Sequence, residues 1–403
     1  PADLERAGLI EPGAAASWLP LAEWRYSTRF AATPATDGER VDLVFDGLDT
    51  VATVTFNGTE VARTKNMHRS YRFDVRELVR GGGNDLTVDF VSSRAYAATV
   101  LESTGLEPMA GDGADRAYRG IRRMAWTLGA GDGPDVQATG LWKGVRLERW
   151  RVARLDAVVP RVTWSAGDGR VEVRVRVERA TDEPLTVYAT VAGVEASAPI
   201  ARGETHATVM LELPGIEPWS PRELGEQRLH DMHVDLHSSD ERLDVHTRSV
   251  GFRDVTLAGV PVVGEDVAIE VDGQALATRV AEWTPIDPLL TRVTHGQVRT
   301  RIGRLLDEGC GVIRVWSGGI YETDGFYDAC DELGALVVQD LPLVGAGYHP
   351  GSPILGEILE ETRENVARLA GHASLLAYGH VEDPGYATTL GEVIASLDPD
   401  RAP

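Results

Sequence analysis

The sequence has little cysteine, and its charge is strongly of one sign. Only two of its 403 residues are cysteines, Cys310 and Cys330, which is too few for a framework of disulfide bonds in a chain of this length. We therefore expect a reducing compartment and a cytoplasmic location. Lysine and arginine number 40 against 62 acidic residues, a net charge of −22. Because that charge repels phosphate, no nucleic-acid partner and no membrane partner are expected.

Long apolar runs and the common catalytic signatures are also missing. The longest uncharged stretch, residues 341–356, is interrupted by proline and glycine, so it is no membrane-spanning helix. The sequence contains no Gly-x-Ser-x-Gly, no phosphate-binding loop, no His-Glu-x-x-His and no Cys-x-x-Cys, and we expect no metal and no cofactor. The chain begins at Pro1 without methionine and ends at Pro403, and we expect both ends to be cuts.

Most of the first 253 residues follow the period-two alternation of half-buried strands. Residues 1–150 are predicted to form an antiparallel β-sandwich, in which Asn57-Gly58 supplies a tight hairpin turn. Residues 151–253 are predicted to form a second, immunoglobulin-like sandwich, because alternating runs recur about every ten residues. In the strand predicted around 230–237, histidines and aspartates share one face and apolar residues the other. That pattern indicates a solvated strand face rather than a metal site.

After residue 253 the pattern changes to short apolar strands that alternate with amphipathic helices. Strands are predicted at 274–281, 311–316, 335–338 and 375–378. Repeated βα units build a parallel sheet covered by helices, so the fold class is multidomain β plus α/β, and a (β/α)8 TIM barrel is the leading form for residues 254–403. A complete barrel needs about 250 residues. With four strands counted here, either the sheet is open or half of the barrel is missing.

Polar and aromatic side chains are predicted where these four strands end. They are Glu282 and Trp283, Arg314 and Trp316, Gln339 and Asp340, and His380 and Glu382. Ligands of parallel α/β sheets bind beyond the carboxyl ends of the strands. Arginine, tryptophan and carboxylates at one rim suit a sugar, because indole stacks on sugar faces and a carboxylic acid protonates the leaving oxygen. Each residue alone also has a structural explanation, namely an ion pair for the arginine or aspartate and core packing for Trp316.

Longer motifs resemble those of one enzyme family. The runs at 314–322 (RVWSGGIYE), 326–334 (FYDACDELG) and 339–340 resemble the barrel of the β-mannosidases of glycoside hydrolase family 2. Further similar runs are 41–50 (VDLVFDGLDT), 66–69 (NMHR), 140–143 (GLWK), 219–222 (WSPR), 225–227 (GEQ) and 251–253 (GFR). The resemblance implies a jelly-roll domain over 1–150, an immunoglobulin-like domain over 151–253, and the amino-terminal half of a catalytic barrel over 254–403.

The resemblance also implies an activity. Family 2 β-mannosidases remove terminal non-reducing β-D-mannose with retention, so the expected partner is a β-mannoside or manno-oligosaccharide substrate. Retention uses an acid/base and a nucleophilic carboxylate about 5 to 5.5 Å apart. By its place in Gly379-His-Val-Glu382, Glu382 matches the acid/base. The residues expected to contact the sugar are Trp316, Arg314, Trp283, Asp340, His380 and Asp132.

Three departures from the family pattern bear on activity. Val381 stands where the family has an asparagine that hydrogen-bonds the sugar, and an alkyl group cannot replace an amide. The loop at 128–134 (LGAGDGP) lacks both tryptophans of the family's Phe-Gly-Trp-Asp-Trp-Gly-Pro. Beyond Glu382 the remaining candidate carboxylate, Glu392, lies in a predicted helix, so a nucleophile is absent and this chain is expected to be inactive alone.

Two alternative functions stay open at this stage. One is a non-catalytic carbohydrate-binding or scaffolding homologue that kept the fold. The other is a different family 2 glycosidase, of the β-galactosidase or β-glucuronidase type. In either case, we expect the first and fourth strands of a half barrel to present unpaired edges that favour self-association.

Overall fold

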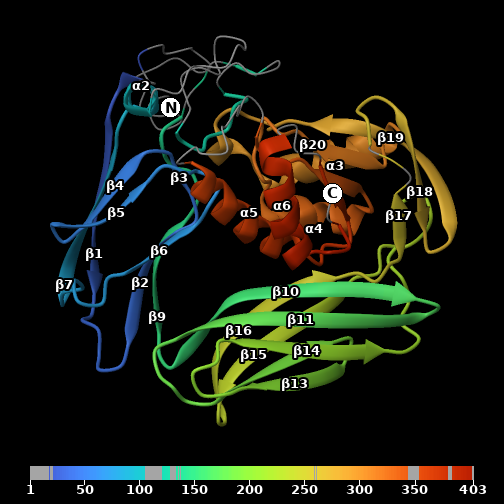
Figure 1. Cartoon of the computed structure of the whole chain (residues 1–403), viewed down its shortest axis with the longest axis horizontal. Helices are drawn as coiled ribbons and strands as arrows, with labels where there is room; N and C mark the ends of the chain where they lie inside the picture. The colour runs from blue at the N-terminus through green and yellow to red at the C-terminus, as the bar shows by residue number, and fades with distance from the viewer. Residues whose placement is uncertain are drawn as a thin grey trace.

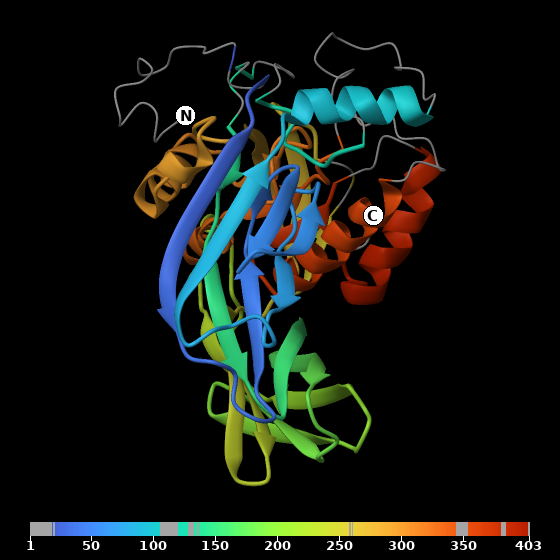
Figure 2. The same cartoon turned by 90° about the vertical axis from the view of Figure 1, so that its left-hand side faces the viewer.

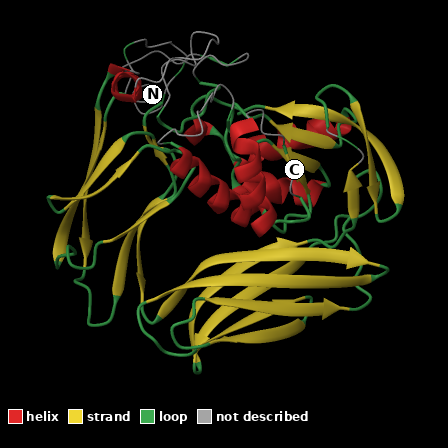
Figure 3. Cartoon of the chain, in the orientation of Figure 1, coloured by secondary structure: helices red, strands yellow, loops and turns green. Residues whose placement is uncertain are grey.

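The computed structural model comprises three regions, which Figure 1 colours from blue through green and yellow to red. It describes residues 18, 21–104, 120–127, 133–134, 136, 138–257, 259, 261–343, 354–379 and 384–401. Figure 3 shows that the helices gather in the third region, apart from α2 (Ser93–Thr104). No helix in the described ranges is long and apolar enough to cross a membrane.

The first region is a β-sandwich, seen edge-on at the left of Figure 1 and facing the viewer in Figure 2. Its strands are β1 (Trp24–Ala32), β2 (Arg40–Phe45), β3 (Leu48–Asp49), β4 (Ala52–Phe56), β5 (Thr59–Thr64), β6 (Tyr71–Asp74), β7 (Gly82–Phe90), β8 (Gly140–Leu141) and β9 (Val145–Trp150). The main sheets run β1-β7-β4-β5 and β6-β2-β9, and β3 pairs with β8. Leu43, Phe56 and Phe90 lie in the core between the sheets. The predicted hairpin turn is confirmed, because Asn57 and Gly58 have φ angles of 51° and 86°.

The second region is a sandwich of a three-stranded and a four-stranded antiparallel sheet. Its strands are β10 (Ala153–Ser165), β11 (Asp168–Arg179), β12 (Leu185–Val191), β13 (Val194–Ile200), β14 (His206–Leu213), β15 (His230–Ser238) and β16 (Glu241–Val250). The sheets run β10-β11-β14 and β13-β12-β15-β16. Alternate side chains of β11 and β12 fill the core. In β15, Met232, Val234 and Leu236 are buried while His233 is exposed, as the alternation predicts.

The third region is a six-stranded sheet with helices against it. Its strands run in the order β17 (Val255–Leu257), β18 (Asp266–Val271), β19 (Gln274–Trp283), β20 (Val312–Val315), β21 (Leu336–Gln339) and β22 (Leu375–Tyr378). The helices are α3 (His295–Asp307), α4 (Asp324–Leu333), α5 (Leu355–Leu369) and α6 (Pro384–Leu397), with a short 3₁₀ helix at Leu290–Arg292. Strands β19 to β22 are parallel. A capping box of Thr294 and Gln297 starts α3, and Gly334 ends α4 with a φ angle of 78°.

One edge of this sheet differs from the expectation, and the other agrees with it, because β22 is the last strand of the sheet among the described residues. The prediction of an unpaired edge on the first parallel strand is wrong, because β18 pairs with β19 antiparallel and β17 extends the sheet further. At the other end, β22 pairs with β21, and arginines cover part of its outer edge. Arg253 and Arg401 both donate to the Leu375 carbonyl, at 2.5 and 2.7 Å.

The two faces of the sheet bury different clusters. Trp283, Val315 and Val337 pack against the helices. Val312 and Val338 point to the opposite face and pack with Val267 and other side chains of β18 and with Trp219. Successive side chains of a strand point to opposite faces, so Arg314, between Ile313 and Val315, lies on the face away from the helices.

Candidate active site

The carboxylate of Asp340 lies where three neighbouring parallel strands end. Arg314 of β20 donates from Nε to both of its oxygens, at 3.0 and 2.9 Å, and from Nη1 to the Pro261 carbonyl at 3.0 Å. On the β22 side, a Cβ atom added to Gly379 would lie 1.7 Å from Asp340 Oδ1. Glycine is therefore required at this position, because the backbone that leaves β22 runs directly against the carboxylate. The Gly379 N–H donates to the Gln339 carbonyl at 2.8 Å, which fixes that approach.

Trp316 follows β20 and opens a tight turn at the same edge of the sheet. Its N–H donates to the Trp283 carbonyl, and its own carbonyl accepts from the Gly319 N–H, both at 3.0 Å. The half-buried indole packs over the turn, since a Cβ atom on Gly318 would lie 2.1 Å from a ring carbon. The Gly318 carbonyl accepts from the Trp126 N–H at 2.8 Å. The turn that carries Trp316 is thus held by the first β-sandwich as well as by the sheet.

Trp283, at the end of β19, does not lie with Arg314 and Asp340. It pairs in register with Val315, so its side chain points to the helix-covered face. Only 1% of Trp283 is exposed, its Nε1 donates to Glu322 at 2.9 Å, and the Arg301 guanidinium lies 4.5 Å from its ring centroid. The structure places Trp283 in the core beneath the rim, out of reach of a ligand held by Arg314.

The other residues expected at the site fall outside the described residues. They are His380, Glu382 and Asp132, together with Val381 and most of the loop at 128–134. Glu392 lies on α6, as the sequence pattern predicts. The described structure therefore brings together two of the expected residues, Arg314 and Asp340, with Trp316 on the adjoining turn.

A buried ion pair that the sequence analysis missed holds the first β-sandwich against α5. Arg122 Nη2 and Nε lie 2.5 and 2.9 Å from the two oxygens of Glu361, and Arg122 donates to the Pro342 carbonyl at 2.5 Å just after β21. Asn66 donates to the same carboxylate at 2.8 Å. A signal was present in the sequence, because Glu361 lies three residues after Ile358 on the apolar face of the helix, where a charge needs a partner.

The same interface buries His68 as a neutral ring. Burial, with Arg122 and Lys143 nearby, lowers the pKa of His68 well below its usual 6.5. Within the described residues neither ring nitrogen has a hydrogen-bond partner, while the His68 carbonyl accepts from Asn365 at 2.9 Å. His68 is therefore a packing group, with its ring centroid 6.1 Å from that of Tyr321.

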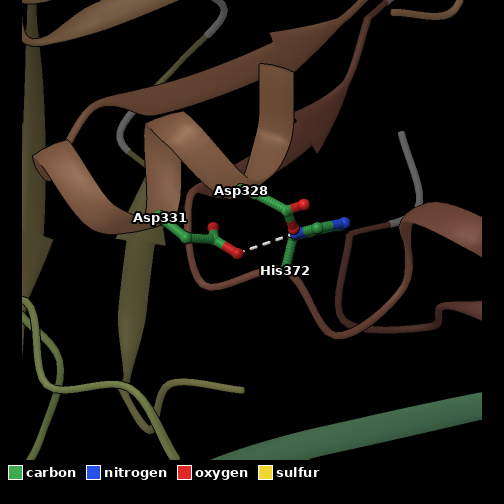
Figure 4. Close-up of side chains that lie close together, drawn as sticks. All are labelled: Asp328, Asp331 and His372. Atoms are coloured by element: carbon green, nitrogen blue, oxygen red, sulfur yellow. Dashed lines mark hydrogen bonds and ion pairs between the residues drawn. The ribbon is translucent and has the colours of Figure 1, made fainter. Parts of the chain in front are cut away.

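A second polar cluster, Asp328, Asp331 and His372, lies on α4 and the loop before β22 (Figure 4). The His372 Nδ1 atom lies 2.7 Å from one oxygen of Asp331, and the other oxygen accepts from the Ser374 N–H at 2.7 Å. Burial alone raises the pKa of Asp331, but His372 and Ser374 outweigh it and hold that pKa below the usual value. Because both Asp331 oxygens already have partners, the cluster is explained as a structural pair that fixes the loop to α4.

Comparison with known proteins identifies the class. The family model for the glycosyl hydrolase 2 galactose-binding domain-like unit matches residues 7–143, and that for glycosyl hydrolases family 2 matches residues 153–253. Beta-mannosidase B from Thermothelomyces thermophilus is 32% identical over 385 residues, which is 93% of this chain and 45% of that protein. Beta-mannosidase from Capra hircus is 27% identical over 399 residues, again 93% of this chain and 45% of that protein.

A solved structure matches the whole fold. The crystal structure of Beta-D-Mannosidase from Dictyoglomus thermophilum superposes with a TM-score of 0.89 at 25% identity, covering 99% of this chain and 53% of that one. The chain belongs to glycoside hydrolase family 2. Within this family it is similar to the amino-terminal portion of β-mannosidases, and it spans about half the length of these relatives.

Proposed function

We propose that this chain supplies the acid/base side of the active site of a retaining β-mannosidase, an enzyme that removes terminal β-D-mannose from its substrates. In this proposal the four parallel strands are the amino-terminal half of a (β/α)8 barrel. The observation that carries it is the contact between Arg314, Asp340 and Gly379 at the carboxyl ends of β20, β21 and β22. It is the edge at which ligands of such sheets bind. The similarity to β-mannosidases supports the choice of sugar.

Each group at this edge has a chemical task in the proposed reaction. Glu382, three residues after Gly379, acts as the general acid that protonates the leaving oxygen and then as the base that activates water. The Asp340 carboxylate accepts hydrogen bonds from sugar hydroxyls, and Arg314 holds that carboxylate in place through its two hydrogen bonds. Trp316 offers its indole to the apolar face of the sugar.

The proposal assigns the nucleophile to no residue of this chain. Of the described carboxylates after Glu382, Glu392 lies on α6 rather than at a strand end, and Asp398 and Asp400 follow that helix and pair with Arg401 and Arg161. Asp340 is held by Arg314 and has the sugar-binding task in this proposal, so without a further carboxylate as nucleophile no glycosyl-enzyme intermediate forms. We therefore propose that the 403-residue chain binds a mannoside but does not turn it over by itself.

An assay of turnover and binding tests the proposal. With 4-nitrophenyl β-D-mannopyranoside we expect no release of nitrophenol by the purified chain. Calorimetric titration with methyl β-D-mannopyranoside should give binding that Trp316→Ala weakens about tenfold or more, whereas Trp164→Ala, at a half-buried tryptophan of the second sandwich, leaves it unchanged. Turnover that Glu382→Gln abolishes would contradict the missing nucleophile. Absence of binding with the fold intact would contradict the site.

A second function is favoured by one specific observation, the valine at position 381. If the chain is a non-catalytic carbohydrate-binding homologue, a longer version of the same protein that includes further βα units binds mannosides but still shows no turnover. Measurable turnover by the longer protein, lost in Glu382→Gln, excludes this alternative.

A further inference from the structure

A pocket of about 310 Å³ lies on the helix-covered side of the sheet, where Trp142 and Lys143 of the first β-sandwich meet the segments after β19 and β20. Its floor is buried and includes Trp283, Ile320 and Glu322. Its mouth is exposed and is lined by Thr291, Thr294, His295 and Thr323. A volume near 300 Å³ is at the lower end of small-molecule sites. Since Arg314 points to the opposite face of the sheet, this pocket is separate from the Arg314–Asp340 rim.

Three polar groups in this pocket form no hydrogen bond or ion pair with the described residues. The Lys143 Nζ atom lies 4.4 Å from the Trp142 ring centroid, and within the described part of the chain it forms no hydrogen bond or ion pair. The hydroxyls of Thr291 and Thr323 also form none there, and Thr323 begins α4 without a side-chain cap. A fourth group, the Glu322 carboxylate, accepts from Trp283 Nε1 and from the Thr323 backbone N–H, and a carboxylate has further lone pairs for a ligand. Donors and acceptors for a ligand are therefore both available.

The charges that line the pocket cancel. Among the described lining residues, Lys143 carries the formal positive charge and Glu322 the negative one. Burial lowers the pKa of Lys143 to about 8 and raises the pKa of Glu322, so both shifts favour the neutral forms. The same burial would penalise a ligand with a net charge, and when Lys143 and Glu322 are ionised either sign of charge on the ligand would meet a like charge. An uncharged ligand that offers both donors and acceptors fits this environment better.

We propose that this pocket binds one uncharged pyranose ring, with Lys143 donating to its hydroxyls and Glu322 accepting from them. The apolar wall that Ile286 and Leu290 form with the Trp142 indole contacts the carbon-bound hydrogens of the ring. Hydroxyl groups that face the mouth reach Thr291 and Thr323. The inference rests on the proposed function only in the choice of a mannose-configured probe.

The two lysines of the chain, Lys65 and Lys143, allow a site-specific test. The purified protein is reductively methylated with and without methyl β-D-mannopyranoside, and the extent of modification at each lysine is read by peptide mass spectrometry. We expect the probe to slow modification of Lys143 at least fivefold in a saturable way and to leave Lys65 unchanged. No protection at saturating probe, or equal protection of both lysines, overturns the proposal.

Variants separate this site from the strand-end rim. Trp316→Ala should leave the protection of Lys143 unchanged even where it removes binding at the rim. Lys143→Met, which removes the donor but keeps the chain length, should abolish the binding that remains in a Trp316→Ala background, whereas Lys65→Met should not. Protection of Lys143 by sulfate alone, but not by the mannoside, would mean an anion site and would refute the pyranose assignment. Loss of Lys143 protection in Trp316→Ala would refute a separate site.

Discussion

The two β-sandwiches are attached to the βα region by different chemistry. The first is attached through a buried ion pair, Arg122 with Glu361, whose side chains are 2% and 0% exposed. The second is attached mainly through arginines that donate to main-chain carbonyls, as when Arg248 donates to Ala370 at 2.7 Å and Arg174 donates to Ser396 at 2.7 Å. A polar cavity of about 650 Å³ also lies between the second sandwich and α4.

This difference determines how much stability each interface should lose when one of its residues is substituted. Removing one member of a buried ion pair leaves the other charge buried and uncompensated. Removing an arginine that donates to a carbonyl takes away the donor but leaves a neutral acceptor that water can reach beside a large cavity. The first interface should therefore be the less tolerant of single substitutions. It is also the one whose segment at 120–127 contacts the turn that carries Trp316.

The largest effect is expected from Glu361→Ala. The substitution leaves Arg122 buried without its counter-ion, so the free energy of unfolding should fall by about 3–5 kcal/mol. The neighbouring Glu360→Ala is the matched control, because Glu360 is exposed and pairs with Arg363 on the helix surface, and it should cost under about 1 kcal/mol. Urea unfolding followed by circular dichroism measures both. Equal losses for the two variants would mean that the first interface is no more sensitive than the surface.

A smaller loss is expected from Asp331→Asn beside the second interface. The amide keeps the shape of the side chain but loses the charged bond to His372, which costs about 1–3 kcal/mol in unfolding free energy. Because the pKa of Asp331 is lowered in the fold, its contribution is present above the unfolded pKa of about 3.9 and is lost as the pH falls through the folded pKa. Glu332→Gln, at an exposed residue of the same helix that pairs with Arg299, is the control and should cost under about 1 kcal/mol.

A pH-dependent effect of similar or smaller size is expected from His68. Its folded pKa lies well below 6.5, so its contribution to stability is full above the unfolded pKa and is lost progressively as the pH falls below about 6.5. The lost free energy is about 1.4 kcal/mol for each unit of pKa difference. His68→Phe should make the free energy of unfolding less dependent on pH below about 6.5. His233→Phe, at an exposed strand position, is the control and should leave this dependence unchanged. An unchanged profile in His68→Phe would show that another group titrates there.

The smallest effect is expected from Arg161→Ala. Arg161 contacts Asp400 through two bonds of 2.7 Å, but the two side chains are 40% and 38% exposed. Such a pair contributes about 0–1 kcal/mol, and salt screens it. Thermal unfolding of Arg161→Ala at low and at high salt measures this contribution. If the unfolding midpoint fell markedly, and by the same amount at both salt concentrations, the second interface would depend on this contact.

The same contrast explains what the sequence alone could predict. Strands such as β11 and β15 could be predicted because their alternate apolar residues fill one core. The capping box at the start of α3 and the glycine after α4 are likewise local signals, which mark the ends of helices in the sequence. The pairing of β18 with β19 was missed because edge partners are not encoded in local periodicity. Arg122 and Glu361 are 239 residues apart in sequence, so nothing near either residue identified its partner.

At the candidate site, the sequence predicted which residues follow the strands but not which way each side chain points. Arg314 and Asp340 meet as the strand-end reasoning requires. Trp283 points to the helices because its register with Val315 fixes its face, and that register cannot be read from a strand end alone. Whether Glu382 joins Asp340 at the rim stays a prediction.

The antiparallel strand beside β19 also has a consequence for the order in which the sheet folds. Parallel strands pair only after their crossover helices have closed long loops, which is slow. The β18–β19 hairpin closes through the two-residue turn Asp272-Gly273, with φ angles of 51° and 77°, and hairpins form in about 1–10 μs. It therefore offers β20 a template in the correct register early in folding. In pulsed hydrogen exchange during refolding, amides of β18 and β19 should gain protection before those of β21 and β22, and the reverse order would refute this role.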